Sequence, residues 1–197
     1  MIAAQPYLLT RYINRKSTPN STFRPLEAKD VQWLCEFLES LSNRTRLVWR
    51  RDHYDLAEAK RLCDAIWRYD KLRMIIEDAD NGKIQGLFEF SFDIPDSDRE
   101  RFARHGIELN ALTDCRFAAC LRDECQGTGL GSLVIPAIKE VSGLFGRSRI
   151  ILWGGVVEDN AQAIRFYRKH GFQTVGRFLD AEGQGNLDML ACLPDIE

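Results

Sequence analysis

A glycine-rich turn between an extended stretch and a helical pattern constrains this chain more than any other feature. Residues 126–131 read Gln-Gly-Thr-Gly-Leu-Gly. The apolar stretch 115–121 precedes them, and apolar residues at helical spacing follow from Leu130 to Phe145. A turn between a strand and a helix directs free backbone N–H groups and the positive end of the helix dipole at one place. Because glycine has no Cβ, a ligand can approach this backbone closely. The sequence therefore predicts a phosphate-binding turn.

The spacing of the glycines distinguishes between kinds of phosphate ligand. A dinucleotide-binding fingerprint would place its third glycine at position 132, which is Ser132. A P-loop would need Gly-Lys-Ser or Gly-Lys-Thr, and the sequence contains neither tripeptide. The spacing that fits is Q/R-x-x-G-x-G/A, filled by Gln126, Gly129 and Gly131.

A second motif lies about thirty residues further along, at residues 160–172. It matches N-x-x-A-x-x-x-Y-x-x-x-G-F through Asn160, Ala163, Tyr167, Gly171 and Phe172. Asparagine is a favoured helix N-cap, and glycine suits the left-handed position after a helix. Together the two motifs resemble the GNAT superfamily of acetyl-CoA-dependent N-acetyltransferases. The resemblance spans roughly residues 21–193, and the two motifs are its specific part.

The resemblance implies an α/β (α+β) fold with a mostly antiparallel twisted sheet, helices on both faces, and splayed fourth and fifth strands. We expect a single domain over residues 21–197, preceded by an N-terminal arm or extra strand over residues 1–20. The sequence patterns predict strands near 22–24, 72–77, 83–92, 115–121, 150–157, 173–178 and 186–193, and helices near 31–41, 55–67, 98–105, 130–145 and 160–170. Residues 44–53 are interpreted as a basic connector, and 93–113 as either a solvated loop or a lid beside the substrate.

The resemblance also implies a binding site for acetyl-CoA. The pyrophosphate would rest on the amides of residues 126–131, and the pantetheine arm would follow the strand before them. Asn160 would either reach this arm or cap its own helix. The residues expected to bind the cofactor are Ala119, Cys120, Leu121, Gln126, Gly127, Thr128, Gly129, Leu130, Gly131, Ser132, Asn160 and Tyr167.

Catalysis requires a route for the proton of the attacking amine and an acid for the leaving thiolate. By resemblance, Tyr167 is the expected acid. The two positions where many relatives carry a glutamate base are Arg116 and Gly155 here. Asp114 and Glu89 are the candidate bases, and a solvated surface carboxylate is the alternative for each.

Arg116 has two alternative interpretations. A cation in the acceptor cleft can hold a substrate carboxylate bidentately. The other interpretation is an ion pair with Asp114 or Asp123.

Composition limits the functional classes. A net charge of −2 argues against a general nucleic-acid binder. The N-terminus has neither a basic segment nor a long apolar run, so we expect a cytoplasmic protein without a membrane span. The six cysteines lack metal-ligand spacing, so we expect reduced thiols and no metal.

We therefore expect an enzyme, a monomer or homodimer, that transfers acetyl from acetyl-CoA to a primary amine on a small molecule or a protein. The alternative is an acyl-CoA-binding sensor that has lost turnover.

Overall fold

A computed structural model describes residues 5–14, 20–68 and 70–194. The expectation for residues 1–20 falls partly outside this range, at 1–4 and 15–19. The chain divides into two compact units. Unit 1 comprises Met1–Glu89 and Ala119–Ala137, and unit 2 comprises Phe90–Ala118 and Ile138–Glu197.

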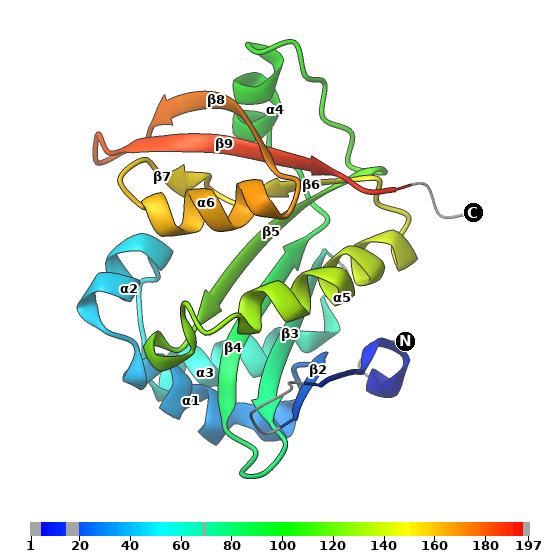
Figure 1. The fold of residues 1–197 in the computed structure, drawn as a ribbon, viewed down its shortest axis with the longest axis vertical. Coiled ribbons are helices and arrows are strands. Elements are labelled where there is room, and N and C mark those ends of the chain that lie inside the picture. The colour runs from blue at the N-terminus through cyan, green and yellow to red at the C-terminus, as the bar shows by residue number, and fades with distance from the viewer. Residues whose placement is uncertain (1–4, 15–19, 69, 195–197) are drawn as a thin grey trace. The chain divides into compact units, whose positions relative to one another are not determined.

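The described residues form a mixed α/β fold (Figure 1). Its strands are β1 (Arg11–Ile13), β2 (Ser21–Pro25), β3 (Lys71–Asp78), β4 (Ile84–Ser91), β5 (Asp114–Leu121), β6 (Arg149–Leu152), β7 (Val156–Val157), β8 (Gln173–Leu179) and β9 (Gly185–Cys192). Its α-helices are α1 (Val31–Ser40), α2 (Asn43–Trp49), α3 (Leu56–Asp64), α4 (Asp96–Ala103), α5 (Leu130–Leu144) and α6 (Ala161–Lys169).

Most strand pairs are antiparallel, as the family resemblance implied. The strands are ordered β1-β2-β3-β4-β5-β6-β9-β7, and β8 pairs with β9. The pairs β1–β2, β2–β3, β6–β9, β7–β9 and β8–β9 are antiparallel, whereas β5 and β6 are parallel. The β5–β6 ladder runs from Asp114↔Arg149 to Phe117↔Leu152, although β5 itself continues to Leu121.

In unit 1, α1 and α3 lie side by side (Figure 1). Each helix buries one apolar face, as expected for amphipathic helices on a sheet. Leu34, Phe37 and Leu38 of α1 and Leu62 of α3 are fully buried together with Ile75 of β3. Asp55 caps α3 by accepting a hydrogen bond from the backbone N–H of Glu58.

The interpretation of residues 44–53 as a connector is wrong, because helix α2 covers 43–49. Ser42 starts the helix: its hydroxyl oxygen accepts a hydrogen bond from the N–H of Thr45 at 3.3 Å. At the other end, the Trp49 ring packs against Phe37 of α1 and against Tyr54, with centroid distances of 6.3 Å for each. A cap and aromatic contacts with other segments therefore stabilise a helix that its basic composition did not reveal.

In unit 2, the strands predicted near 173–178 and 186–193 are confirmed as β8 and β9, which pair as an antiparallel hairpin. The predicted single strand 150–157 is instead two strands, β6 and β7. Gly154 and Gly155 separate the two strands. Their φ values of +74° and +71° are ones that residues other than glycine rarely adopt. A Cβ on Gly155 would also lie 2.8 Å from the Leu187 carbonyl oxygen, so glycine permits a close backbone approach here.

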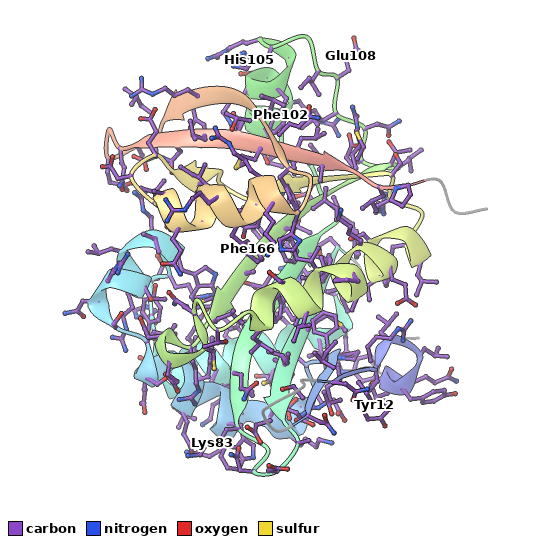
Figure 2. All side chains as sticks on the ribbon, in the orientation of Figure 1. Tyr12, Lys83, Phe102, His105, Glu108 and Phe166 are labelled. Atoms are coloured by element: carbon purple, nitrogen blue, oxygen red, sulfur yellow. The ribbon has the colours of Figure 1, made fainter. Side chains whose placement is uncertain are left out.

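The segment between β4 and β5 carries α4, which packs against β8. Figure 2 labels Phe102 on this helix and His105 just beyond it. Phe102 is fully buried in a cluster with Ile94 and Ile151. Arg101 donates from Nε to both carboxylate oxygens of Asp188 on β9, at 2.9 and 2.8 Å. The segment is thus anchored within unit 2 by apolar and charged contacts, not solvated along its whole length.

No helix in residues 5–14, 20–68 and 70–194 combines the length and apolar character needed to cross a membrane.

Candidate active site

The glycine turn lies in unit 1 and joins β5 to α5. A short 3-10 helix, Asp123–Cys125, follows β5, and α5 begins at Leu130. Gly127 and Gly129 adopt φ values of +72° and +91°, in the left-handed region that favours glycine. A Cβ on Gly129 would meet no atom within 4 Å, so this glycine is needed for its backbone conformation, not for space within the protein.

Hydrogen-bond donors converge at the start of α5. The first N–H groups of an α-helix have no acceptor within the helix, so the amides of Leu130 and Gly131 can serve an anion. Two other expected donors are engaged within the protein. The Gln126 backbone N–H donates to the Asp123 carbonyl oxygen at 3.2 Å, and the Thr128 hydroxyl donates to the Cys125 carbonyl oxygen at 2.8 Å.

The end of β5 leads directly into this turn. Ala119 and Leu121 are half-buried and Cys120 is buried. Burial raises the pKa of the Cys120 thiol, which therefore stays protonated near neutral pH. The Leu121 carbonyl oxygen accepts a hydrogen bond from Nε2 of Gln126 at 3.1 Å, so this side chain holds the strand end against the turn.

A junction between the turn and α2 was not predicted from the sequence. The Asp123 carboxylate accepts hydrogen bonds from the Ser42 N–H at 2.9 Å, the Ser42 hydroxyl at 2.6 Å and the Thr45 hydroxyl at 2.8 Å. Nε2 of Gln126 donates to the same Thr45 hydroxyl oxygen at 3.1 Å. Burial alone would raise the pKa of Asp123, but the hydrogen bonds from Ser42 and Thr45 outweigh it and lower this pKa. The one local signal was Ser42 at a helix N-cap position.

Asn160 and Tyr167 lie in unit 2: Asn160 precedes α6 as its N-cap, and Tyr167 is on the second turn of this helix. Oδ1 of Asn160 accepts a hydrogen bond from the Ala163 N–H at 3.1 Å, so this side chain caps its own helix. The cap does not use the Nδ2 donor. Tyr167 is half-buried, and its ring makes edge contacts with Phe166 and Phe172, with centroid distances of 5.2 Å for both. These contacts fix the ring's orientation.

Asp114, a candidate base, is fully buried in unit 2. Its oxygens accept hydrogen bonds from Nε and Nη2 of Arg149 at 2.6 and 2.7 Å, and from the Asn110 N–H at 2.6 Å. A general base must come within hydrogen-bond reach of its substrate. The observed contacts give Asp114 a structural role and argue against a catalytic one.

Glu89, the other candidate base, is buried in unit 1 with 8% of its side chain exposed. Nε of Arg73 donates to its Oε1 at 2.9 Å, and Nη2 of Arg51 donates to its Oε2. Both carboxylate oxygens are therefore engaged by arginines, which gives Glu89 a structural role and argues against a catalytic one.

Arg116 is buried in unit 2 and held by other residues of that unit. Nε donates to the Asp93 carbonyl oxygen at 2.9 Å, and Nη2 donates to the Ser91 hydroxyl at 3.0 Å. Nη1 lies 3.6 Å from a carboxylate oxygen of Asp98, and the guanidinium lies 4.4 Å from the Trp153 ring centroid. Within unit 2, the carboxylates observed beside this guanidinium are those of Asp93, at 3.8 Å, and Asp98.

The expected site residues fall in two groups. Unit 1 contains Glu89 and residues 119–132, and unit 2 contains Asp114, Arg116, Asn160 and Tyr167. Strand β5 contributes to both, because Ala118 is its last residue in unit 2 and Ala119 its first in unit 1. In the described part of the chain, no group of three or more His, Cys, Asp or Glu side chains is arranged to hold a metal ion.

Comparisons with known proteins place this arrangement in a family. The model of the acetyltransferase (GNAT) family matches residues 35–172. A search of curated proteins found no match. Among solved structures, the GNAT domain of S. lividans PAT superposes with a TM-score of 0.72 at 18% identity, covering 95% of this chain and 99% of that one.

Two further structures have named substrates. Ribosomal-protein-S5-alanine acetyltransferase from Vibrio fischeri gives a TM-score of 0.69 at 16% identity, covering 95% of this chain and 99% of that one. Spermidine N-acetyltransferase from Vibrio cholerae, in complex with CoA and spermine, gives a TM-score of 0.66 at 21% identity, covering 88% of this chain and 95% of that one. These likenesses show the fold, and the family match covers more than half of the chain. The chain therefore belongs to the GNAT family and is an acetyl-CoA-dependent N-acetyltransferase.

Proposed function

We propose that this enzyme transfers acetyl from acetyl-CoA directly to a primary amine on a small molecule or a protein. The observation that carries the proposal is the glycine turn, with left-handed Gly127 and Gly129 immediately before the first amides of α5. This arrangement suits a diphosphate, because helix N-termini and glycine turns present N–H groups to anions.

The residues near the turn fit coenzyme A. The amides of Gly127 to Gly131 would hold the diphosphate, with Ser132 beside them. The backbone of Ala119, Cys120 and Leu121 would bind the pantetheine arm. The family motif assigns Asn160, a residue of unit 2, to the same arm, and its Nδ2 would be the donor. Bound acetyl-CoA supplies an acetyl group activated as a thioester.

The amine must lose a proton before it attacks. A primary amine has a reference pKa near 10.4, so only about one molecule in a few thousand is free at pH 7. Because Glu89 and Asp114 are both engaged by arginines, we propose that this proton leaves through water. Turnover at low acceptor concentration should then rise with pH in step with the free amine.

Tyr167 is the proposed acid for the leaving thiolate. Its ring is fixed between Phe166 and Phe172, and a fixed hydroxyl is suited to positioned proton transfer. Direct attack by the amine requires neither a covalent enzyme intermediate nor a metal ion. We further propose that the enzyme acts as a monomer or a homodimer.

The test is release of coenzyme A, followed with a thiol reagent, on a panel of primary amines. Calorimetric binding of coenzyme A is measured on the same preparation. Turnover of at least one amine above the hydrolysis background supports the proposal. Binding without turnover across the panel would instead identify an acyl-CoA sensor.

A further inference from the structure

A pocket of about 470 Å³ lies on the surface of unit 1, at α2 and the segment that follows it. Two arginines, one amide, one phenol and one apolar side chain line it: Asn43, Arg46, Leu47, Arg51 and Tyr54. None of these lining side chains is acidic. A pocket of this composition is poorly suited to a polycationic ligand and well suited to an anion.

Arg46 contributes a positive charge that no carboxylate in the described residues neutralises. Its Nη2 donates to the carbonyl oxygens of Leu38 and Glu39 at 3.2 and 2.8 Å, and its guanidinium lies 4.7 Å from the Tyr54 ring centroid. Its buried Nε has no hydrogen-bond partner. Carbonyl groups and an aromatic ring orient this guanidinium, but they leave its net charge in place.

Arg51 adds to the positive potential of the pocket. It belongs to a cluster in which the largely buried Arg51 and Arg73 and the exposed Arg61 face the two buried carboxylates of Glu58 and Glu89. Burial and the neighbouring arginines lower the pKa of Arg73 to about 10. These five side chains carry one more positive than negative charge, and Arg51 is the member of the cluster that lines the pocket.

Helix α2 links the pocket to the glycine turn through hydrogen bonds. Asn43, Arg46 and Leu47 all lie on α2. This helix is tied to the turn through Thr45, whose hydroxyl bonds both Asp123 and Gln126. Helix α2 therefore contributes residues both to the pocket and to the hydrogen bonds that hold the turn.

We propose that this pocket binds an oxyanion, a carboxylate or a phosphate, carried by the amine acceptor. The proposal rests on the acetyl transfer proposed above and specifies its acceptor as an amine that also bears a negative group. Arginine is suited to this role, because its planar guanidinium binds carboxylate and phosphate bidentately. The exposed amide of Asn43 can supply a further N–H donor.

The experiment compares primary amines that share one carbon skeleton and differ only in the distal group: carboxylate, phosphate, carboxamide or ammonium. We expect kcat/KM for at least one anionic acceptor to exceed that for the carboxamide by about tenfold or more, within the usual range for charge-assisted hydrogen bonds. The ammonium acceptor should be the poorest. Comparison of the carboxylate acceptor with the phosphate acceptor identifies which oxyanion the enzyme prefers.

Variants then assign the preference to the pocket. Arg46→Gln should reduce the anionic preference about tenfold through KM, whereas Arg46→Lys should retain part of it. Asn43→Asp places a negative charge in the lining without touching the contacts of Arg46, and should reduce the preference as well. Arg44→Gln is the matched control, because Arg44 is an exposed arginine of α2 that does not line the pocket.

Two outcomes would overturn the proposal: equal kcat/KM for all four acceptors, or an anionic preference unchanged in both Arg46→Gln and Asn43→Asp. Binding of coenzyme A is measured on the same preparations. This measurement distinguishes the absence of an anion site from the absence of acetyl transfer. If coenzyme A binds but no amine reacts, Trp49 fluorescence is titrated with glutarate and with inorganic phosphate. Saturable quenching that Arg46→Gln abolishes supports the anion site, and its absence contradicts it.

Discussion

The side-chain amide of Gln126 donates a hydrogen bond to the hydroxyl of Thr45, at 3.1 Å. This bond joins the glycine turn to α2, and Asp123 reinforces it through the same hydroxyl at 2.8 Å. The family motif explains Gln126 by its place beside the diphosphate. The observed contacts add a structural role, in which Gln126 connects the glycine turn to α2, the helix that contributes Arg46 to the surface pocket.

Asp123→Asn should weaken this junction and destabilise the protein by about 1–3 kcal/mol, the usual range for hydrogen bonds to a charged group. Folding lowers the pKa of Asp123, so its contribution is fully present above the unfolded pKa. The contribution is lost as pH falls through the folded pKa. The difference in melting temperature between wild type and Asp123→Asn should therefore shrink between pH 7 and pH 3. A constant difference across that range would contradict a charge-dependent junction.

Gly129→Ala should weaken binding of coenzyme A, because alanine strains a backbone with φ +91° and adds a Cβ at the surface that faces the ligand. Gly82→Ala is the control, since Gly82 has φ +70° and open space around its Cβ position. Both variants should lose about 1 kcal/mol or more of folding stability. Only Gly129→Ala should raise the dissociation constant for coenzyme A, measured by calorimetry. If Gly82→Ala raised it equally, the glycine turn would have no special role in binding.

Tyr167→Phe should lower kcat by roughly 10²-fold, within the usual range for a general acid. The fold should be retained, because the ring contacts with Phe166 and Phe172 do not require the hydroxyl. Tyr12→Phe serves as the control, since Tyr12 lies on β1 and is 80% exposed. Steady-state kinetics under saturating acetyl-CoA provides the measurement, and a near-wild-type kcat would exclude Tyr167 as the acid.

Asp114→Asn should act on stability and not on chemistry. Removing one partner of a buried ion pair costs about 3–5 kcal/mol, and the partial exposure of Arg149 places the expected loss at the low end. Denaturant unfolding measures this loss. The fraction of the variant that remains folded should show the wild-type pH profile of kcat/KM. A large fall in kcat/KM with loss of the acidic limb of this profile, in a folded variant, would restore Asp114 as the base.

Local patterns were sufficient to predict much of the fold. The Asn160 cap, the left-handed Gly171 and the hairpin of β8 and β9 all depend on residues close in sequence. Helix α2 was missed because Thr45, Val48 and Trp49 are weak helix formers, and the contacts of Trp49 with other segments became known only in the folded chain.

The parts of the site that the sequence did not predict depend on distant pairs. Ser42 and Asp123 are 81 residues apart, and Asp114 and Arg149 are 35 apart. Periodicity and motif spacing carry no information about such contacts. The acidic character of Asp114 and Glu89 was evident, whereas the arginines that engage them were not. The assignments of Tyr167 and of the cofactor-binding residues stay predictions.

The most direct measurement is a calorimetric comparison of coenzyme A with pantetheine, which lacks the diphosphate and the nucleotide. If the turn at residues 126–131 holds the diphosphate, coenzyme A should bind at least about 10²-fold more tightly, and Gly129→Ala should remove most of that difference. Equal affinities for the two ligands, or no heat with coenzyme A from folded protein, would contradict the account.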